Sequence, residues 1–151
     1  KIDPTLNSSL KKNLKILVAE DDKTNQKLIS AILKKIGYNA KLVSNGKEAT
    51  QIVKQENFHL IFMDIQMPEM DGLDATKIIM LDESILEKPY IVALTANAIK
   101  GDKEKYLAAG MYHYLSKPIL IDEIQNLLEE LELKIFHKNN SSTSDSNLGG
   151  E

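Results

Sequence analysis

The sequence contains no cysteine, no tryptophan and no arginine, so all 19 basic residues are lysine. The absence of cysteine excludes disulfides and thiol chemistry and fits a reducing compartment, so we expect a cytoplasmic location. Bidentate contacts with phosphates and base edges are typically made by arginine, and its absence argues against nucleic-acid binding. No apolar run reaches the length of a membrane span and no signal peptide is apparent, so we expect no membrane contact by this domain.

The length of 151 residues, with a net charge of −3, predicts a single folded domain. Residues 1–13 are polar without sustained periodicity and are interpreted as a linker, which leaves residues 14–136 as the domain. Residues 137–151 form a Ser/Asn-rich segment of low complexity that we expect to be disordered. Because the chain begins with Lys1 and not with methionine, we expect it to be a piece of a longer protein.

Short apolar runs alternate with stretches of helical periodicity along the domain. The alternation predicts a doubly wound α/β fold, with five parallel strands and helices on both faces of the sheet. The expected strands are 15–20, 38–43, 58–64, 90–95 and 112–116, and the expected helices run from Asp22 or Thr24 to Gly37 and over 46–55, 73–79, 97–109 and 121–136. The helix over 97–109 has little apolar surface, so we expect it to be the least firmly docked element.

Asp64 ends the most apolar of these strands. Five of the six residues before it are large and apolar, which is typical of a strand buried on both faces. Pro68 and the Asp71-Gly72 pair then prevent the strand from continuing, so Asp64 is placed at the sheet edge where open α/β folds bind ligands. A lone aspartate in such a position is most often a loop-starting or helix-capping residue.

A second acidic strand end changes that interpretation. The strand over 15–20 ends in Glu20, Asp21 and Asp22, and if both strands lie centrally, Glu20 and Asp21 converge on Asp64. Carboxylates that close either raise a pKa or bind a hard cation, and an all-oxygen site suits Mg²⁺.

Two more strand ends carry complementary chemistry. The strand over 90–95 ends in Thr95, and Lys117, followed directly by proline, comes after the strand over 112–116. Each alone is an ordinary turn or surface residue. Together with Asp64 and the acidic pair they provide a carboxylate nucleophile, a metal site, a hydroxyl donor and a cation, which is the equipment for taking a phosphoryl group onto an aspartate.

Over residues 14–134, the motifs LVAEDD, MDIQMPEMDG, ALTA and SKP resemble the receiver domain of two-component response regulators. The resemblance implies a flavodoxin-like fold with strand order 2-1-3-4-5. It also implies roles for particular residues: Asp64 as phosphoacceptor, Glu20, Asp21, Asp64 and the Gln66 backbone carbonyl as metal ligands, Thr95 as switch hydroxyl, Tyr114 as switch aromatic, and Lys117 as partner of the phosphoryl group.

The motifs VAEDD, MDIQMPEMDG and ALTANA resemble receivers of hybrid sensor histidine kinases more than stand-alone transcription regulators. This implies transfer from a phosphohistidine onto Asp64 with Mg²⁺, or Mn²⁺ in its place, followed by a conformational switch or relay to a histidine phosphotransfer protein. The expected partners are a histidine kinase, a phosphotransfer protein or both, and the domain is expected to be a monomer or weak dimer. No enzymatic activity of the domain is expected beyond its own phosphorylation and autodephosphorylation. The parent protein would be a hybrid histidine kinase, and such a parent is expected to be attached to the membrane.

Other interpretations are weaker. A stand-alone single-domain response regulator is the main alternative. A flavodoxin-like mononucleotide binder would have to cradle a phosphate beside Glu20-Asp21-Asp22, which would repel it. A haloacid-dehalogenase-type phosphatase requires a second acid two residues after its nucleophile, where this chain has Gln66. The three histidines are scattered and are interpreted as ordinary polar positions.

Overall fold

The computed structural model describes residues 14–96 and 102–137. The chain divides into two units, Lys1–Ile119 and Leu120–Glu151, which we describe separately. Within the described residues, no helix is both long and apolar enough to cross a bilayer.

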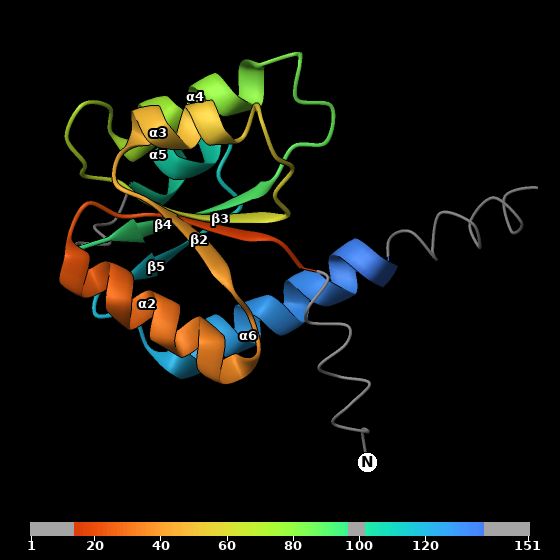
Figure 1. The fold of residues 1–151 in the computed structure, drawn as a ribbon. Helices are drawn as coiled ribbons and strands as arrows, with labels where there is room; N and C mark the ends of the chain where they lie inside the picture. The colour runs from red at the N-terminus through yellow and green to blue at the C-terminus, as the bar shows by residue number, and fades with distance from the viewer. Residues whose placement is uncertain (1–13, 97–101, 138–151) are drawn as a thin grey trace, which may run out of the picture. The chain divides into compact units, whose positions relative to one another are not determined.

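A five-stranded parallel sheet forms the centre of the first unit (Figure 1), in the order β2-β1-β3-β4-β5. Its strands are β1 Ile16–Ala19, β2 Ala40–Val43, β3 Leu60–Asp64, β4 Tyr90–Thr95 and β5 His113–Ser116. Strands β1 and β3 are buried along their whole length, whereas β2 at the edge is partly exposed. Central parallel strands are covered on both faces, which explains their continuous apolar sequences. The predicted fold class and strand order are confirmed.

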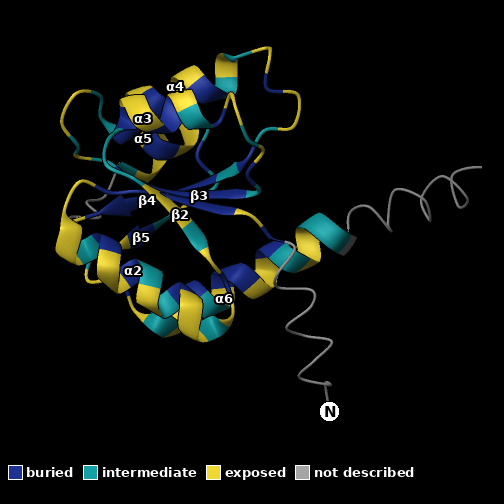
Figure 2. Cartoon of the chain, in the orientation of Figure 1, coloured by how far each residue is buried: buried dark blue, intermediate teal, exposed yellow. Residues whose placement is uncertain are grey.

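Helices cover both faces of this sheet. They are α2 Lys23–Ile36, α3 Gly46–Ile52, α4 Gly72–Leu81 and α5 Asp102–Ala109. Helix α2 lies on one face, and α3, α4 and α5 lie on the other (Figure 1). Each helix turns a buried stripe toward the sheet and an exposed one toward solvent (Figure 2). On the α3–α5 face, Leu17 and Ile61 from the sheet share one apolar cluster with Ile79 and Tyr106 from the helices.

The ends of α2 follow from its flanking residues. Asp22 accepts hydrogen bonds from the backbone N–H groups of Thr24 and Asn25, at 2.8 and 3.2 Å, and so caps the first turn. Gly37 ends the helix with a φ of 114°, a left-handed conformation that suits glycine. The predicted start and end of this helix are therefore confirmed.

Several element ends differ from the prediction. Strand β2 begins at Ala40 and not at 38, because the Tyr38 N–H donates to the Leu33 carbonyl at 2.8 Å and belongs to the end of α2. Helix α3 ends at Ile52 instead of 55, and α4 extends over ten residues, beyond the short helix expected at 73–79. The first residues of the helix predicted at 97–109 lie outside the described residues, and α5 covers the rest.

The second unit contains α6, Ile121–Glu132, which continues into the π-helix η1, Leu133–His137. Its apolar residues recur at helical spacing: Ile124, Leu127, Leu128 and Leu131. The helix predicted at 121–136 is thus present, with a change of helix type in its last turn. His137, which the sequence assigned to the tail, is the last residue of η1. The linker 1–13 and the tail 138–151 lie outside the described residues.

His59, next to the start of β3, is one histidine with a defined structural role. Its Nδ1 accepts a hydrogen bond from the Lys15 backbone N–H at 2.9 Å, which requires an unprotonated Nδ1. Burial lowers the pKa of His59 below its ordinary value, although the Glu87 charge opposes this shift. Because the folded state prefers neutral His59, its contribution to stability is complete above the unfolded pKa of about 6.5 and is lost as pH falls through the folded pKa.

We expect His59→Gln to weaken the dependence of stability on pH between about pH 7.5 and about pH 5, because the substitution removes this titration. Urea denaturation at several pH values measures the free energy of unfolding. His113→Gln, which removes an exposed imidazole from β5, is the matched control. Equal slopes for wild type and His59→Gln would contradict the assignment.

Candidate functional site

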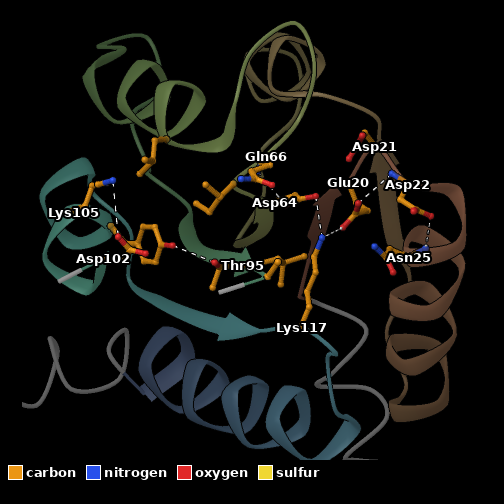
Figure 3. A pocket seen from close by; sticks show the side chains of 15 residues that line it. Glu20, Asp21, Asp22, Asn25, Asp64, Gln66, Thr95, Asp102, Lys105 and Lys117 are labelled. Carbon is orange, nitrogen blue, oxygen red and sulfur yellow. Dashed lines mark hydrogen bonds and ion pairs between the residues drawn. The ribbon is translucent and has the colours of Figure 1, made fainter. Parts of the chain in front are cut away.

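The carboxyl ends of four strands meet around one pocket of about 580 Å³ (Figure 3). Glu20 follows β1 directly, Asp64 is the last residue of β3, Thr95 is the last residue of β4, and Lys117 follows β5. All four line this pocket. Parallel strands bring their ends to one edge of a sheet, so residues nearly a hundred positions apart in sequence become neighbours.

Lys117 joins the two buried carboxylates of the pocket. Its Nζ lies 3.1 Å from Glu20 Oε1 and 3.1 Å from Asp64 Oδ2 (Figure 3). Both acids are buried, whereas the Lys117 side chain is 23% exposed. A single ammonium group therefore offsets part of the repulsion between two acids that have lost most of their hydration.

The protonation of these groups follows from their surroundings. Burial raises the pKa of the Glu20 carboxyl, and the Asp64 charge adds to this rise, while the Asp22 backbone N–H and Lys117 oppose it. Burial alone would lower the pKa of Lys117, but its contacts with Asp64 and Glu20 outweigh burial and raise the pKa. Lys117 is therefore the constant positive charge of the site.

The donor set fits a hard divalent cation. Glu20, Asp21 and Asp64 each offer a carboxylate oxygen, and the three atoms lie within 4.8 Å of one another. Although Lys117 Nζ is near, Glu20 Oε1 is buried and accepts no well-formed hydrogen bond from the described residues. A buried carboxylate oxygen whose contact with a lysine is electrostatic and not a well-formed hydrogen bond can also bind a metal cation. Asp21 is exposed at the mouth of the pocket, which leaves room for water ligands.

Glycine at position 72 fixes the loop that follows Asp64. The Gly72 N–H donates to the Ile65 carbonyl at 2.9 Å, and a Cβ at position 72 would lie only 2.2 Å from the Asp64 carbonyl oxygen. No other residue therefore fits without moving Asp64. Within the loop, the Gln66 N–H donates to Asp64 Oδ1 at 3.2 Å and orients the carboxylate. Gln66 lines the pocket, and the role of its carbonyl as a metal ligand stays a prediction.

Two residues at the start of α2 fix Glu20. The Asp22 N–H donates to Glu20 Oε2 at 3.1 Å, and the buried side chain of Gln26 donates through Nε2 to the Glu20 carbonyl at 2.5 Å. The Asp22 carboxylate itself caps α2, as described above, so it adds charge beside the pocket while its Oδ1 is engaged by backbone N–H groups. Gln26 could not be recognised from the sequence, because a glutamine inside a helix carries no distinctive signal.

The predicted switch residues are linked by a tyrosine that was not among the predicted site residues. Thr95 lies in the pocket, and Tyr114 is half-buried on β5 without lining it. Between them, Tyr106 of α5 donates a hydrogen bond from its hydroxyl to Thr95 Oγ1 at 3.2 Å. The available signal was that Tyr106 is the one aromatic residue of the helix predicted at 97–109.

The sequence matches the profile of the response regulator receiver domain over residues 16–129. The chain belongs to this family. It is 42% identical over 113 residues to the signal transduction histidine-protein kinase BarA of Escherichia coli (strain K12), which covers 75% of this chain and 12% of BarA. It is 37% identical over 131 residues to hybrid signal transduction histidine kinase K of Dictyostelium discoideum, covering 83% of this chain and 11% of the kinase. The receiver chain thus spans about a tenth of the length of these relatives.

Solved structures agree with this receiver fold. The receiver domain of the Pseudomonas aeruginosa sensor histidine kinase PA1611, which has a magnesium ion coordinated in its active site cleft, is 39% identical, with a TM-score of 0.71 and coverage of 79% of this chain and 97% of that one. The receiver domain of Saccharomyces cerevisiae Ssk1, crystallised with the histidine phosphotransfer protein Ypd1, belongs to a structure that is 33% identical, with a TM-score of 0.76 and coverage of 82% and 91%. The predicted receiver family is confirmed, and the individual residue roles stay predictions.

We expect Lys117→Met to destabilise the metal-free receiver by about 1–3 kcal/mol, because it leaves Glu20 and Asp64 without their shared cation. The same substitution should enlarge the rise in melting temperature on adding Mg²⁺, because without Lys117 the cation offsets more of the repulsion between Glu20 and Asp64. Calorimetry with and without Mg²⁺ measures both effects. Lys105→Met is the control. Lys105 borders the same pocket, but its side chain is exposed and its Nζ lies 3.9 Å from Asp102 Oδ1, away from the buried acids. Equal effects of the two substitutions would show that Lys117 does not neutralise the acids.

Proposed function

We propose that this receiver domain accepts a phosphoryl group on Asp64 from a phosphohistidine, in a reaction that depends on Mg²⁺. The observation that carries the proposal is the convergence of Glu20, Asp64 and Lys117 at one sheet edge, with both acids 3.1 Å from one ammonium group. A structural ion pair would need one acid. A second buried acid beside the first one destabilises the fold, and retaining a residue at such a cost indicates that the site uses it.

Each residue of the site has a separate role in the transfer. A carboxylate oxygen of Asp64 forms a bond to phosphorus as the bond between phosphorus and the histidine nitrogen breaks, and the electron pair of that bond stays on the nitrogen. The Gln66 N–H holds Asp64 Oδ1 in place. Lys117 is positioned to pair with the incoming phosphoryl oxygens as a point charge. When bound by Glu20, Asp21 and Asp64, Mg²⁺, or Mn²⁺ in its place, supplies positive charge that reduces repulsion between the carboxylates and the phosphoryl group.

We propose that the switch involves Thr95 and Tyr114. Thr95 carries a hydroxyl at the pocket and can donate to a phosphoryl oxygen on Asp64. Tyr114 is only half-buried, and its ring turns inward once the Thr95 side chain moves. The phosphorylated state then ends by hydrolysis of the aspartyl phosphate, which returns the domain to its starting state.

We propose that the chain is a receiver segment of a hybrid histidine kinase and relays its phosphoryl group to a histidine phosphotransfer protein. The support is the hybrid kinase among its relatives and the Ypd1 complex of a similar receiver. Helix α2 begins directly after the acidic cluster and carries Leu28, which is 44% exposed. An exposed apolar residue beside the pocket suits docking of a partner helix. The sequence that flanks this segment in its parent protein tests the proposal: a kinase core upstream supports a hybrid kinase, and its absence supports a stand-alone regulator.

We expect the purified domain to be phosphorylated by acetyl phosphate only when Mg²⁺ or Mn²⁺ is present, because the carboxylate cluster repels an anionic donor until a cation is bound. Asp64→Asn should abolish labelling, as measured by intact-mass spectrometry. Asp74→Asn, on the exposed face of α4, removes an aspartate away from the pocket and should label like wild type. Labelling of Asp64→Asn, or equal labelling of the wild type in chelator, would refute the proposed function.

We expect Leu28→Glu to slow phosphoryl transfer from a phosphorylated histidine phosphotransfer protein such as Ypd1 by about tenfold, since a buried charge at the interface costs on the order of 1–2 kcal/mol. Labelling by acetyl phosphate should keep its wild-type rate. Leu81→Glu is the matched control, because Leu81 is 80% exposed on α4, on the opposite face of the sheet. If Leu28→Glu and Leu81→Glu transfer at the same rate, α2 is not the docking surface.

A further inference from the structure

Helix α5 places a buried phenol against the switch threonine. Tyr106 is 4% exposed, and its hydroxyl donates to Thr95 Oγ1 at 3.2 Å. A buried hydroxyl that loses its hydrogen-bond partner costs free energy. The position of the Thr95 side chain and the hydrogen bonding of α5 are therefore linked in this state.

The same ring also contacts the second switch residue. The rings of Tyr106 and Tyr114 have their centroids 5.8 Å apart and are inclined by 54°, a favourable tilted aromatic pair. One side chain of α5 thus touches Thr95 at the end of β4 and Tyr114 on β5. Movement of either switch residue changes the contacts of Tyr106.

We propose that Tyr106 is a positioning residue that holds Thr95 in its unphosphorylated arrangement and transmits the departure of Thr95 to α5. This inference rests on the proposed function of Asp64 and adds a residue to it. When Thr95 turns toward a phosphoryl group, the Tyr106 hydroxyl loses its acceptor, and a shift of α5 restores hydrogen bonding. The hydrogen bond therefore opposes the switch before phosphorylation and makes α5 the element that responds to it.

The packing of α5 supports this role. Tyr106 and Ala109 are the two residues of α5 that are buried, and the rest of the helix is more exposed. An element with so few buried contacts has a low free-energy cost of displacement. The aromatic ring also belongs to the apolar cluster that includes Ile79 and Met111. Phenylalanine would keep this packing and remove the hydroxyl alone, so the two roles of Tyr106 can be separated.

The first experiment measures binding of beryllofluoride, a phosphoryl mimic, to the domain with saturating Mg²⁺ by isothermal titration calorimetry. Tyr106→Phe should bind about 2- to 10-fold more tightly than wild type, the range expected from losing one hydrogen bond that favours the unbound state. In a Thr95→Val background, Tyr106→Phe should have no effect, because the acceptor is already absent. A side chain that only fills space would alter the melting temperature without this dependence on Thr95.

Tyr90→Phe is the matched control, since it removes a phenol at the other end of β4, and it should bind the mimic like wild type. A second measurement needs no phosphoryl mimic: the side-chain couplings of Thr95 in the free protein, by NMR, should show one rotamer in wild type and averaging in Tyr106→Phe. Unchanged rotamer populations, or unchanged or weaker mimic binding by Tyr106→Phe, would overturn the inference. If wild type binds no mimic, the proposed function fails, and the rotamer measurement still decides the role of Tyr106.

Discussion

Repulsion between buried carboxylates is the constraint on which this structure depends. Glu20 and Asp64 share one ammonium group, that of Lys117, and Asp21 lies beside them. The three carboxylates exceed the one lysine by two negative charges when all are ionised, which is the charge that a divalent cation balances. Adding an anionic phosphoryl group to this pocket without a cation would increase the repulsion. The proposed phosphoryl chemistry and its proposed dependence on a metal ion therefore rest on the same charge imbalance.

A cluster of this kind requires a rigid backbone, because like charges separate wherever the chain can yield. The sheet supplies part of this rigidity, because β3 ends at Asp64 itself and β1 ends at the residue before Glu20. The loops supply the rest: Gly72 approaches the Asp64 carbonyl more closely than any side chain permits, and Gln26 holds the Glu20 carbonyl from α2. These contacts fix the backbone on both sides of the acids, so the carboxylates can relieve their repulsion mainly by protonation or by binding a cation.

The strands and their acidic ends were predictable because each apolar run stops at a charged or hydroxylated residue, and parallel strands bring such ends together. The strand order came only from family resemblance. Tyr38 was misplaced because an apolar residue after a glycine looks the same in a helix cap and in a strand. Tyr106 was not identified because α5 has a weak apolar face, and only the folded path of the chain brings its phenol to Thr95. Contacts made across a sheet edge by one side chain leave no periodic signal.

The burial of β4 determines where a signal from Asp64 can go. Every residue of β4 except Tyr90 is buried, and its backbone is paired with β3 on one side and β5 on the other, so displacing the strand would disrupt the core of the sheet. Thr95 can then respond to a phosphoryl group mainly by turning its side chain. A side-chain rotation is transmitted only to groups that touch it, and Tyr106 is one of them. The rigidity that holds the acids in place therefore directs the conformational change away from the sheet and toward α5, the helix with few buried contacts.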